Sequence, residues 1–140
     1  DNPPFSLDRV ILNVNLDMVS HSEKGELYAS GTFRHPELKA YLTHTQPGIK
    51  IVLGHDNPEF NVDDWTYQSD QGAFHAKNIP FLYFGVEDHK DYHRASDDFE
   101  NINQEFFVDA SEAILEIVDN LDKDRNIQSI FRQKLQMKKQ

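Results

Sequence analysis

The stretch "RVILNVNLDMV", residues 9–19, decides the fold class of this chain. Its first part is apolar at consecutive positions, which is typical of a central strand whose two faces are both covered. Its carboxyl end turns polar at Asn15 and Asp17. Ligands of open α/β sheets gather outside the carboxyl ends of the strands. The stretch therefore predicts a central strand that presents a carboxylate at the ligand-binding edge of a sheet.

The rest of the chain alternates between segments of strand and helix character. Apolar runs bounded by Gly or Pro predict further strands, and apolar side chains three and four residues apart predict helices. The expected strands lie at 26–31, 49–54 and 81–86, and the expected helices lie at 35–45, at 69–79 and from Asn103 onward. This order of elements is that of an α/β domain.

The last expected helix has the clearest periodic pattern. A single apolar stripe is formed by Phe107, Ala110, Ile114, Ile117, Val118 and Leu121. The shorter helix at 69–79 begins at a capping residue, which is either Ser69 or Asp70. Segment 55–68 is interpreted as a loop, because Asn-Pro and Asp-Asp interrupt it.

Charge is unevenly spread along the 140 residues, whose formal net charge is −10. Residues 1–122 hold 8 Lys and Arg against 23 Asp and Glu, whereas residues 123–140 hold 6 against 1. An acidic body repels phosphate backbones, so no nucleic-acid partner is expected, and 123–140 is interpreted as a basic helical tail. No apolar run reaches the roughly 20 residues of a membrane-spanning helix. The absence of Cys excludes disulfides and thiolate metal sites.

The loop "DHKDYHRASDD", residues 88–98, holds two histidines and four aspartates after the expected strand 81–86. If that strand neighbours the strand before Asp17, both loops open on the same edge of the sheet, where a carboxylate and an imidazole suit zinc. The residues alone leave a metal site and a solvated acidic loop as alternatives. His89 and His93 would chelate a metal on a helix, but the charged neighbours indicate a loop, so His89 is interpreted as solvated.

Other candidate sites are weaker. The aspartate run lacks the glycine and the closing glutamate of an EF-hand, and Ser69 has no G-x-S-x-G context. Trp65 either faces a substrate or packs in the loop before Ser69. Surface or hydrogen-bonded structural roles are expected for the scattered histidines His21, His35, His44, His55 and His75.

Four short motifs occur in a recognisable order: "NLDM" ends a strand, "SDQGAF" opens a helix, "NIP" leads into a strand, and "YHRASD" follows it. Over about residues 1–122 this order resembles the carboxy-terminal half of the catalytic domain of co-catalytic zinc aminopeptidases. That family includes leucine-type aminopeptidases and aminopeptidase Y, with glutamate carboxypeptidases and glutaminyl cyclases as relatives. The resemblance implies part of a mixed central β-sheet flanked by helices, of the phosphorylase/hydrolase-like kind, incomplete relative to the family domain.

The resemblance also implies roles for individual residues. Asp17 matches the carboxylate ligand of one zinc, and His93 matches the imidazole ligand of the other. Tyr92 matches the tyrosine that hydrogen-bonds the substrate carbonyl and the oxyanion formed from it. Asp97 is expected to support the loop or the imidazole. Asp70 and Trp65 are further candidates for supporting a ligand or contacting substrate, and Gln71 stands where the family usually has His.

A complete site of this family holds two zinc ions, about five protein ligands and a glutamate base. In the family the bridging Asp, the first His and both glutamates precede the "N-x-D-M" strand, so they are expected outside this chain. We therefore expect the isolated chain to be an inactive fragment of an exopeptidase that removes amino-terminal residues from peptides by metal-activated water. Its partners would be a peptide substrate, the missing amino-terminal half of the domain and, through an uncovered sheet edge, a second copy. A secreted or periplasmic location is expected.

Two alternatives remain open at this point. One is a non-catalytic module of the same fold that serves binding or dimerisation. The other is a glutaminyl cyclase, which uses one zinc on the same scaffold. The joint presence of Asp17, Tyr92 and His93 favours the peptidase.

Overall fold

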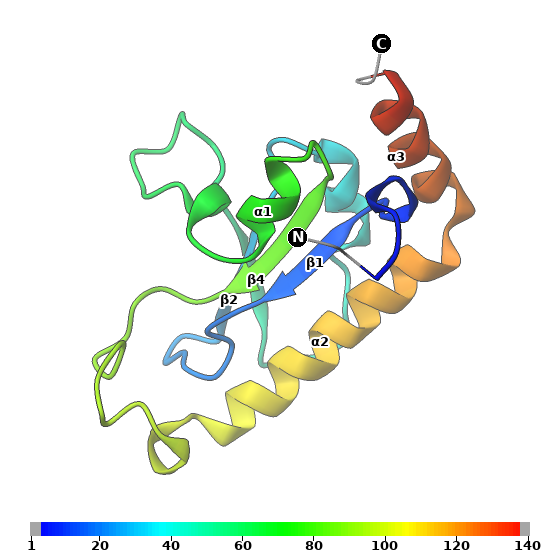
Figure 1. Cartoon of the computed structure of the whole chain (residues 1–140). Helices are drawn as coiled ribbons and strands as arrows, with labels where there is room; N and C mark the ends of the chain where they lie inside the picture. The colour runs from blue at the N-terminus through cyan, green and yellow to red at the C-terminus, as the bar shows by residue number, and fades with distance from the viewer. Residues whose placement is uncertain (1–3, 138–140) are drawn as a thin grey trace.

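A computed structural model describes residues 4–137 and shows a four-stranded mixed sheet with helices on both faces (Figure 1). The sheet has the order β1-β4-β2-β3. β1 and β4 run parallel, β2 and β3 run parallel, and β2 is antiparallel to β4. The strands are β1 (Asn13–Leu16), β2 (Glu26–Ser30), β3 (Lys50–Leu53) and β4 (Phe81–Gly85). The predicted α/β class with a mixed sheet is confirmed.

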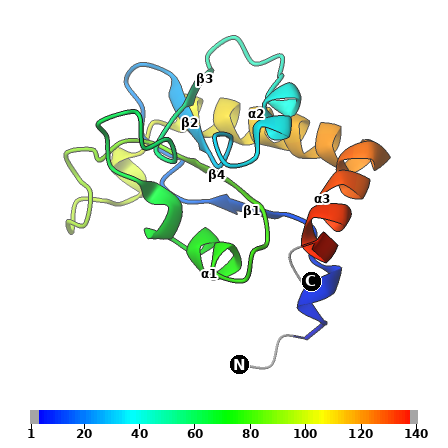
Figure 2. The same cartoon turned by 90° about the horizontal axis from the view of Figure 1, so that it is seen from above.

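Two α-helices cover opposite faces of the sheet, as Figure 2 shows. The short α1 (Gln71–His75) lies on one face, the long α2 (Gln104–Lys123) lies on the other, and α3 (Arg125–Met137) follows α2. Short 3-10 helices occupy the connections: η1 (Leu7–Arg9), η2 (Pro36–Tyr41), η3 (Trp65–Tyr67) and η4 (Phe99–Asn101). In this described part of the chain no helix is long and apolar enough to cross a membrane.

The expected helix at 35–45 is instead the shorter 3-10 helix η2. Pro36 starts it, as the sequence suggested, and it ends at Tyr41. The residues that follow, Thr43 to Thr45, are poor helix formers, which is consistent with the early end.

β4 is an interior strand of the described sheet, paired with β1 and β2, and all five of its residues are buried. Leu82 and Phe84 join the core on the α2 side, whereas Phe81 and Tyr83 contact aromatic side chains of the α1 side. The prediction of a central strand within residues 9–19 is wrong for the described chain, because β1 lies at the edge. The apolar pattern of a strand indicates which of its two faces are covered. It does not indicate whether other strands pair with both of its edges.

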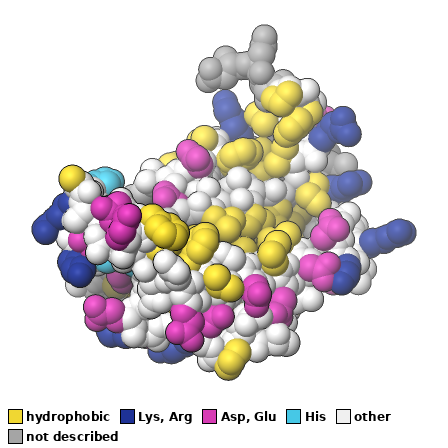
Figure 3. Space-filling view, turned by 90° about the horizontal axis from the view of Figure 1, so that it is seen from below, with side chains coloured by type: hydrophobic (Ala, Val, Ile, Leu, Met, Phe, Trp, Pro, Cys, Tyr) yellow, Lys and Arg dark blue, Asp and Glu magenta, His cyan; other side chains and the backbone are white. Residues whose placement is uncertain are grey.

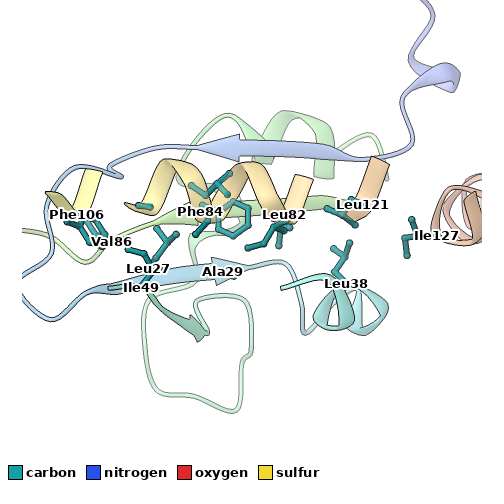
Figure 4. Close-up of a cluster of buried hydrophobic side chains, with 14 of the residues drawn as sticks. Leu27, Ala29, Leu38, Ile49, Leu82, Phe84, Val86, Phe106, Leu121 and Ile127 are labelled. Atoms are coloured by element: carbon teal, nitrogen blue, oxygen red, sulfur yellow. The ribbon is translucent and has the colours of Figure 1, made fainter. Parts of the chain in front are cut away.

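The main core lies between the sheet and α2 (Figure 4). Asn103 caps α2 by accepting a 3.0 Å hydrogen bond from the backbone N–H of Phe106. Phe106 is buried while Phe107 is 40% exposed, so the predicted stripe is wrong at its first residue. The rest of the buried face is formed by Ala110, Ala113, Ile114, Ile117 and Leu121.

α3 packs onto the same core. Ile127 and Phe131 of α3 are 3% and 1% exposed and belong to the main hydrophobic cluster. Tyr41 of η2 donates a 2.6 Å hydrogen bond to Asp124, just before α3. Lys134 of α3 forms an ion pair with Glu37 of η2. The segment therefore adds both apolar and polar contacts to the domain.

An apolar groove of about 160 Å³ lies beside the edge strand β1. It runs between Ile11 and Val14 on one side and Val118, Ile127 and Phe131 on the other. The space-filling view in Figure 3 shows hydrophobic side chains gathered in a band on the lower face of the molecule. The open edge of β1 is thus accompanied by uncovered apolar surface.

Candidate active site at the carboxyl ends of β1 and β4

The parallel pairing of β1 and β4 brings two polar loops to one edge of the sheet. Leu16 lies opposite Phe84, and the next backbone N–H, that of Asp17, donates a 3.1 Å hydrogen bond to the carbonyl of Phe84. Asp17 and the loop that follows β4 therefore leave the sheet side by side, as Figure 1 shows. The condition set by the sequence analysis, that the two strands be neighbours, is met, so both loops open on the same edge.

The Asp17 carboxylate is the end of a hydrogen-bond chain. Ser69 Oγ donates to Asp17 Oδ2 at 2.7 Å. Asn15 Nδ2 donates to Ser69 Oγ at 3.1 Å and to Gln71 Oε1 at 2.8 Å. Gln71 Nε2 in turn donates to the carbonyl of Trp65 at 2.6 Å. Side chains in β1, before α1 and within α1 thus hold the carboxylate in a fixed orientation.

Gln71 has a defined role that the sequence did not reveal. Its side chain is fully buried, and its amide both accepts from Asn15 and donates to Trp65. A neutral amide supplies one acceptor and one donor at once without placing a charge in the interior. No local sequence pattern indicates this contact, because Asn15 and Gln71 lie 56 residues apart in the chain.

Two further candidates take structural positions. Asp70 is the exposed amino-terminal cap of α1, where its carbonyl accepts from the N–H of Ala73. The Trp65 ring stacks on His55 with centroids 3.4 Å apart, and its edge contacts include Tyr83. The Trp65 ring thus packs within the domain, and its contact with substrate stays a prediction.

His55 is buried and hydrogen-bonded on both ring nitrogens. Nδ1 lies 2.8 Å from the carbonyl of Asp63, and Nε2 lies 3.0 Å from Glu87 Oε1. The expected hydrogen-bonded structural role of this histidine is confirmed.

Tyr92 and His93 form a stacked pair in the loop after β4, with ring centroids 3.9 Å apart. Tyr92 is half-buried and His93 is exposed. The hydroxyl of Tyr83 in β4 donates to the carbonyl of Asp17 at 3.3 Å. Burial, and then the charges of Asp17 and Tyr92, raise the pKa of the Tyr83 phenol. Tyr83 is thus a neutral phenol that ties the end of β4 to the backbone of Asp17.

Backbone strain occurs at both loops. Met18, directly after Asp17, has a φ of 58°, and His93 itself has a φ of 54°. Residues with a Cβ rarely adopt this left-handed conformation, which costs on the order of 1 kcal/mol or more. Such strain persists where the surrounding structure imposes it, and it gathers at functional sites.

Asp17 and His93 do not form a three-ligand cluster with other described residues. Within residues 4–137, the group whose potential ligand atoms lie within 4.8 Å of one another consists of His21, His89 and Asp91. Asp97 has an exposed side chain, and its N–H donates to the carbonyl of Arg94.

His21 and His89 lie against each other in the structure. Their rings stack with centroids 3.9 Å apart, and both residues are half-buried. The interpretation of His89 as a solvated side chain is therefore wrong. The two histidines lie far apart in sequence, and only the parallel pairing of β1 with β4 brings the segments that follow these strands together.

Comparison with known proteins gives one match. The family model described as "Peptidase family M28" matches residues 1–118. This range includes Asp17, Tyr92 and His93. No curated protein and no solved structure matches the chain.

Proposed function

The chain belongs to peptidase family M28, and from this premise we propose that it forms one side of the active site of a zinc-dependent aminopeptidase. The observation that supports this most directly is the meeting of two loops at one sheet edge, where Asp17 N–H donates to the carbonyl of Phe84 and the Tyr83 hydroxyl donates to the carbonyl of Asp17. A peptidase acts on peptides, and the finer assignment to amino-terminal residues follows the motif order "NLDM", "SDQGAF", "NIP" and "YHRASD".

Asp17 and His93 fit the role of zinc ligands. A carboxylate oxygen and an imidazole nitrogen are both typical zinc donors. The Ser69 hydroxyl occupies one lone pair of Asp17 Oδ2, and the carboxylate as a whole is exposed. His93 is likewise exposed at the same edge. Zinc, when bound in peptidases of this kind, supplies Lewis-acid activation of water and of the scissile carbonyl.

Tyr92 is proposed to donate a hydrogen bond to the carbonyl oxygen of the scissile bond. A phenol supplies one directional donor, and its contribution grows as negative charge develops on that oxygen. The ring stacks on His93 and meets the His89 ring edge-on, with centroids 6.4 Å apart. These contacts hold the ring while the residue stays half-exposed toward the edge.

The described residues supply two of the ligands that such a site needs. Two ligands from two loops hold zinc weakly, so we propose that the remaining ligands and the glutamate base come from another segment of the complete catalytic domain. That segment is placed at the β1 edge, beside the apolar groove formed with Val118 and Phe131. When this edge is open, two copies can pair there. Sedimentation of the isolated chain measures that self-association.

The test uses the complete catalytic domain that contains this chain. Hydrolysis of aminoacyl-nitroanilides is expected, with loss of turnover in a chelator and recovery on adding zinc. The isolated 140-residue chain is expected to show no turnover with or without zinc. Chelator-insensitive turnover would count against the proposal. Absent turnover would favour a non-catalytic module, and cyclisation of amino-terminal glutamine would favour a glutaminyl cyclase.

A further inference from the structure

We propose that His21, His89 and Asp91 form a binding site for a divalent transition-metal ion. Each residue offers one ligand atom, and the three atoms lie within 4.8 Å of one another. None of the three is a ligand that the family resemblance implies. The inference goes beyond the proposed peptidase function, because it concerns a different set of donors.

Each of the three residues carries one buried polar atom that has no other partner. His21 Nε2, His89 Nδ1 and Asp91 Oδ2 are inaccessible to solvent and find no hydrogen-bond partner in the described chain. Asp91 is only 7% exposed. Buried polar atoms nearly always have a partner, and an unpaired buried carboxylate oxygen is especially costly. One cation shared by the three groups satisfies all of these atoms together.

The other polar atom of two of these side chains is already held by a serine. His21 Nδ1 lies 3.1 Å from Ser20 Oγ. In the tautomer that leaves Nε2 free to bind a metal, Nδ1–H donates to this hydroxyl. Ser96 Oγ donates to Asp91 Oδ1 at 2.8 Å and leaves Oδ2 free. Outer hydrogen bonds of this kind orient metal ligands in known sites.

The backbone fixes the spacing of His89 and Asp91. Two overlapping turns follow β4: Tyr92 N–H donates to the carbonyl of His89 at 3.0 Å, and Arg94 N–H donates to that of Asp91 at 2.9 Å. His21 comes from the segment after β1. A metal here would therefore cross-link the two loops that hold Asp17 and His93.

Metal binding requires a local rearrangement. The His21 and His89 rings are parallel within 6°, whereas a ligating nitrogen directs its lone pair in the plane of its ring. One ring must therefore turn. Four ligands around zinc at about 2.0–2.1 Å lie roughly 3.4 Å apart, so the three atoms close by on the order of 1 Å. Both histidines line a cleft of about 710 Å³, which provides room and an entry path.

The donor set indicates which ions would bind. Two imidazole nitrogens with one carboxylate oxygen suit Zn²⁺, Co²⁺ or Ni²⁺, whereas Mg²⁺ and Ca²⁺ prefer oxygen ligands alone. Three protein ligands leave a fourth position for water or an added ligand.

The test titrates Zn²⁺ into the metal-free 140-residue chain by calorimetry. One equivalent is expected to bind with a Kd on the order of 1 μM. His89→Ala and Asp91→Asn are each expected to weaken binding by about 100-fold or more. His44→Ala, at another half-buried histidine, and His93→Ala, at the proposed catalytic ligand, are expected to retain it.

The melting temperature gives a second test, which applies even where a variant folds poorly. Zinc at 100 times its Kd raises the ratio of folded to unfolded chain by about 100-fold, so the melting temperature of the wild type should rise with zinc. The melting temperature of His93→Ala should rise with zinc by the same amount. That of His21→Gln, at a half-buried position, should rise much less. No saturable binding by the wild type, or full binding by His89→Ala, overturns the proposal. Binding that is lost in His93→Ala and kept in His89→Ala also overturns it, and assigns the ion to the proposed catalytic ligands instead.

Discussion

The hydroxyl of Ser69 donates a 2.7 Å hydrogen bond to Oδ2 of Asp17. It joins the end of β1 to the start of α1, two segments that the sheet places on the same edge. The sequence suggested Ser69 or Asp70 as the helix cap, and Asp70 takes that position. The Ser69 side chain serves the carboxylate, and its carbonyl accepts from the N–H of Gly72. The serine of the "S-D" motif thus hydrogen-bonds the proposed metal ligand Asp17.

Ser69→Ala should weaken zinc binding by the complete catalytic domain by about 10- to 100-fold, because the carboxylate loses the group that orients it. In the isolated chain, loss of the hydrogen bond should lower the free energy of unfolding by about 0.5–1.5 kcal/mol. Zinc titration and urea denaturation measure the two effects. Ser129→Ala, on the exposed side of α3, is the matched control. Wild-type zinc affinity in Ser69→Ala would contradict the orienting role.

Gln71→Leu should destabilise the isolated chain by about 1–3 kcal/mol, because the carbonyl of Trp65 and the amide of Asn15 each lose a partner when the buried Gln71 amide is removed. Leucine has a similar volume, so the effect reports polar pairing more than packing. Urea denaturation measures the change. Gln104→Leu, at an exposed position of α2, should change stability by less than about 0.5 kcal/mol. A small effect at Gln71 would show that water replaces the amide.

Much of the fold follows from local patterns. The strands at Glu26–Ser30, Lys50–Leu53 and Phe81–Gly85 and the start of α2 after Asn103 lie within a residue or two of their expected places. These elements have strong apolar runs or a capping residue. The edge position of β1 did not follow, because the order of strands in a sheet is set by pairing between distant segments.

The site was predictable in part for the same reason. Asp17, Tyr92 and His93 belong to contiguous motifs and could be assigned from them. The stacking of His21 on His89 depends on the pairing of β1 with β4, so no local pattern reports it. The role of Gln71 likewise depends on a contact with Asn15 across the fold.

Tyr92→Phe in the complete catalytic domain should lower kcat by about 10- to 1000-fold, because the carbonyl oxygen loses a hydrogen-bond donor in the transition state. Zinc content should stay unchanged, since Tyr92 is not proposed as a ligand. Steady-state kinetics and metal analysis measure the two quantities. Tyr67→Phe, at a residue that is 67% exposed, is the control. Wild-type turnover in Tyr92→Phe would remove the proposed role.

Phe131→Ala should lower the free energy of unfolding by about 3–5 kcal/mol, because a side chain that is 1% exposed leaves a cavity in the main core. Its neighbour Ile130 is 40% exposed, so Ile130→Ala should cost much less. Urea denaturation measures both variants. If residues 123–140 form a tail separate from 1–122, Phe131→Ala and Ile130→Ala should lower the free energy of unfolding by equally small amounts.

The hydrogen bond between Tyr41 and Asp124 should make stability depend on pH at the alkaline end. Donation to Asp124 at 2.6 Å, together with burial, raises the pKa of Tyr41 from 10.0 to about 12 and lowers the pKa of Asp124. A group whose pKa is raised by folding stabilises fully below its unfolded pKa and loses that stabilisation as pH rises through the folded pKa. The contribution of Tyr41 is therefore lost between about pH 10 and 12.

The difference in unfolding free energy between the wild type and Tyr41→Phe should be constant from about pH 6 to 9 and shrink as pH rises from about 10. It should also shrink as pH falls below about 4, because Asp124, whose pKa is lowered by folding, then takes up a proton and no longer accepts the bond as a carboxylate. Urea denaturation at a series of pH values measures the difference. Tyr67→Phe controls for loss of an exposed phenol, and a difference for Tyr41→Phe that persists undiminished near pH 12 would show that the bond to Asp124 does not stabilise the fold.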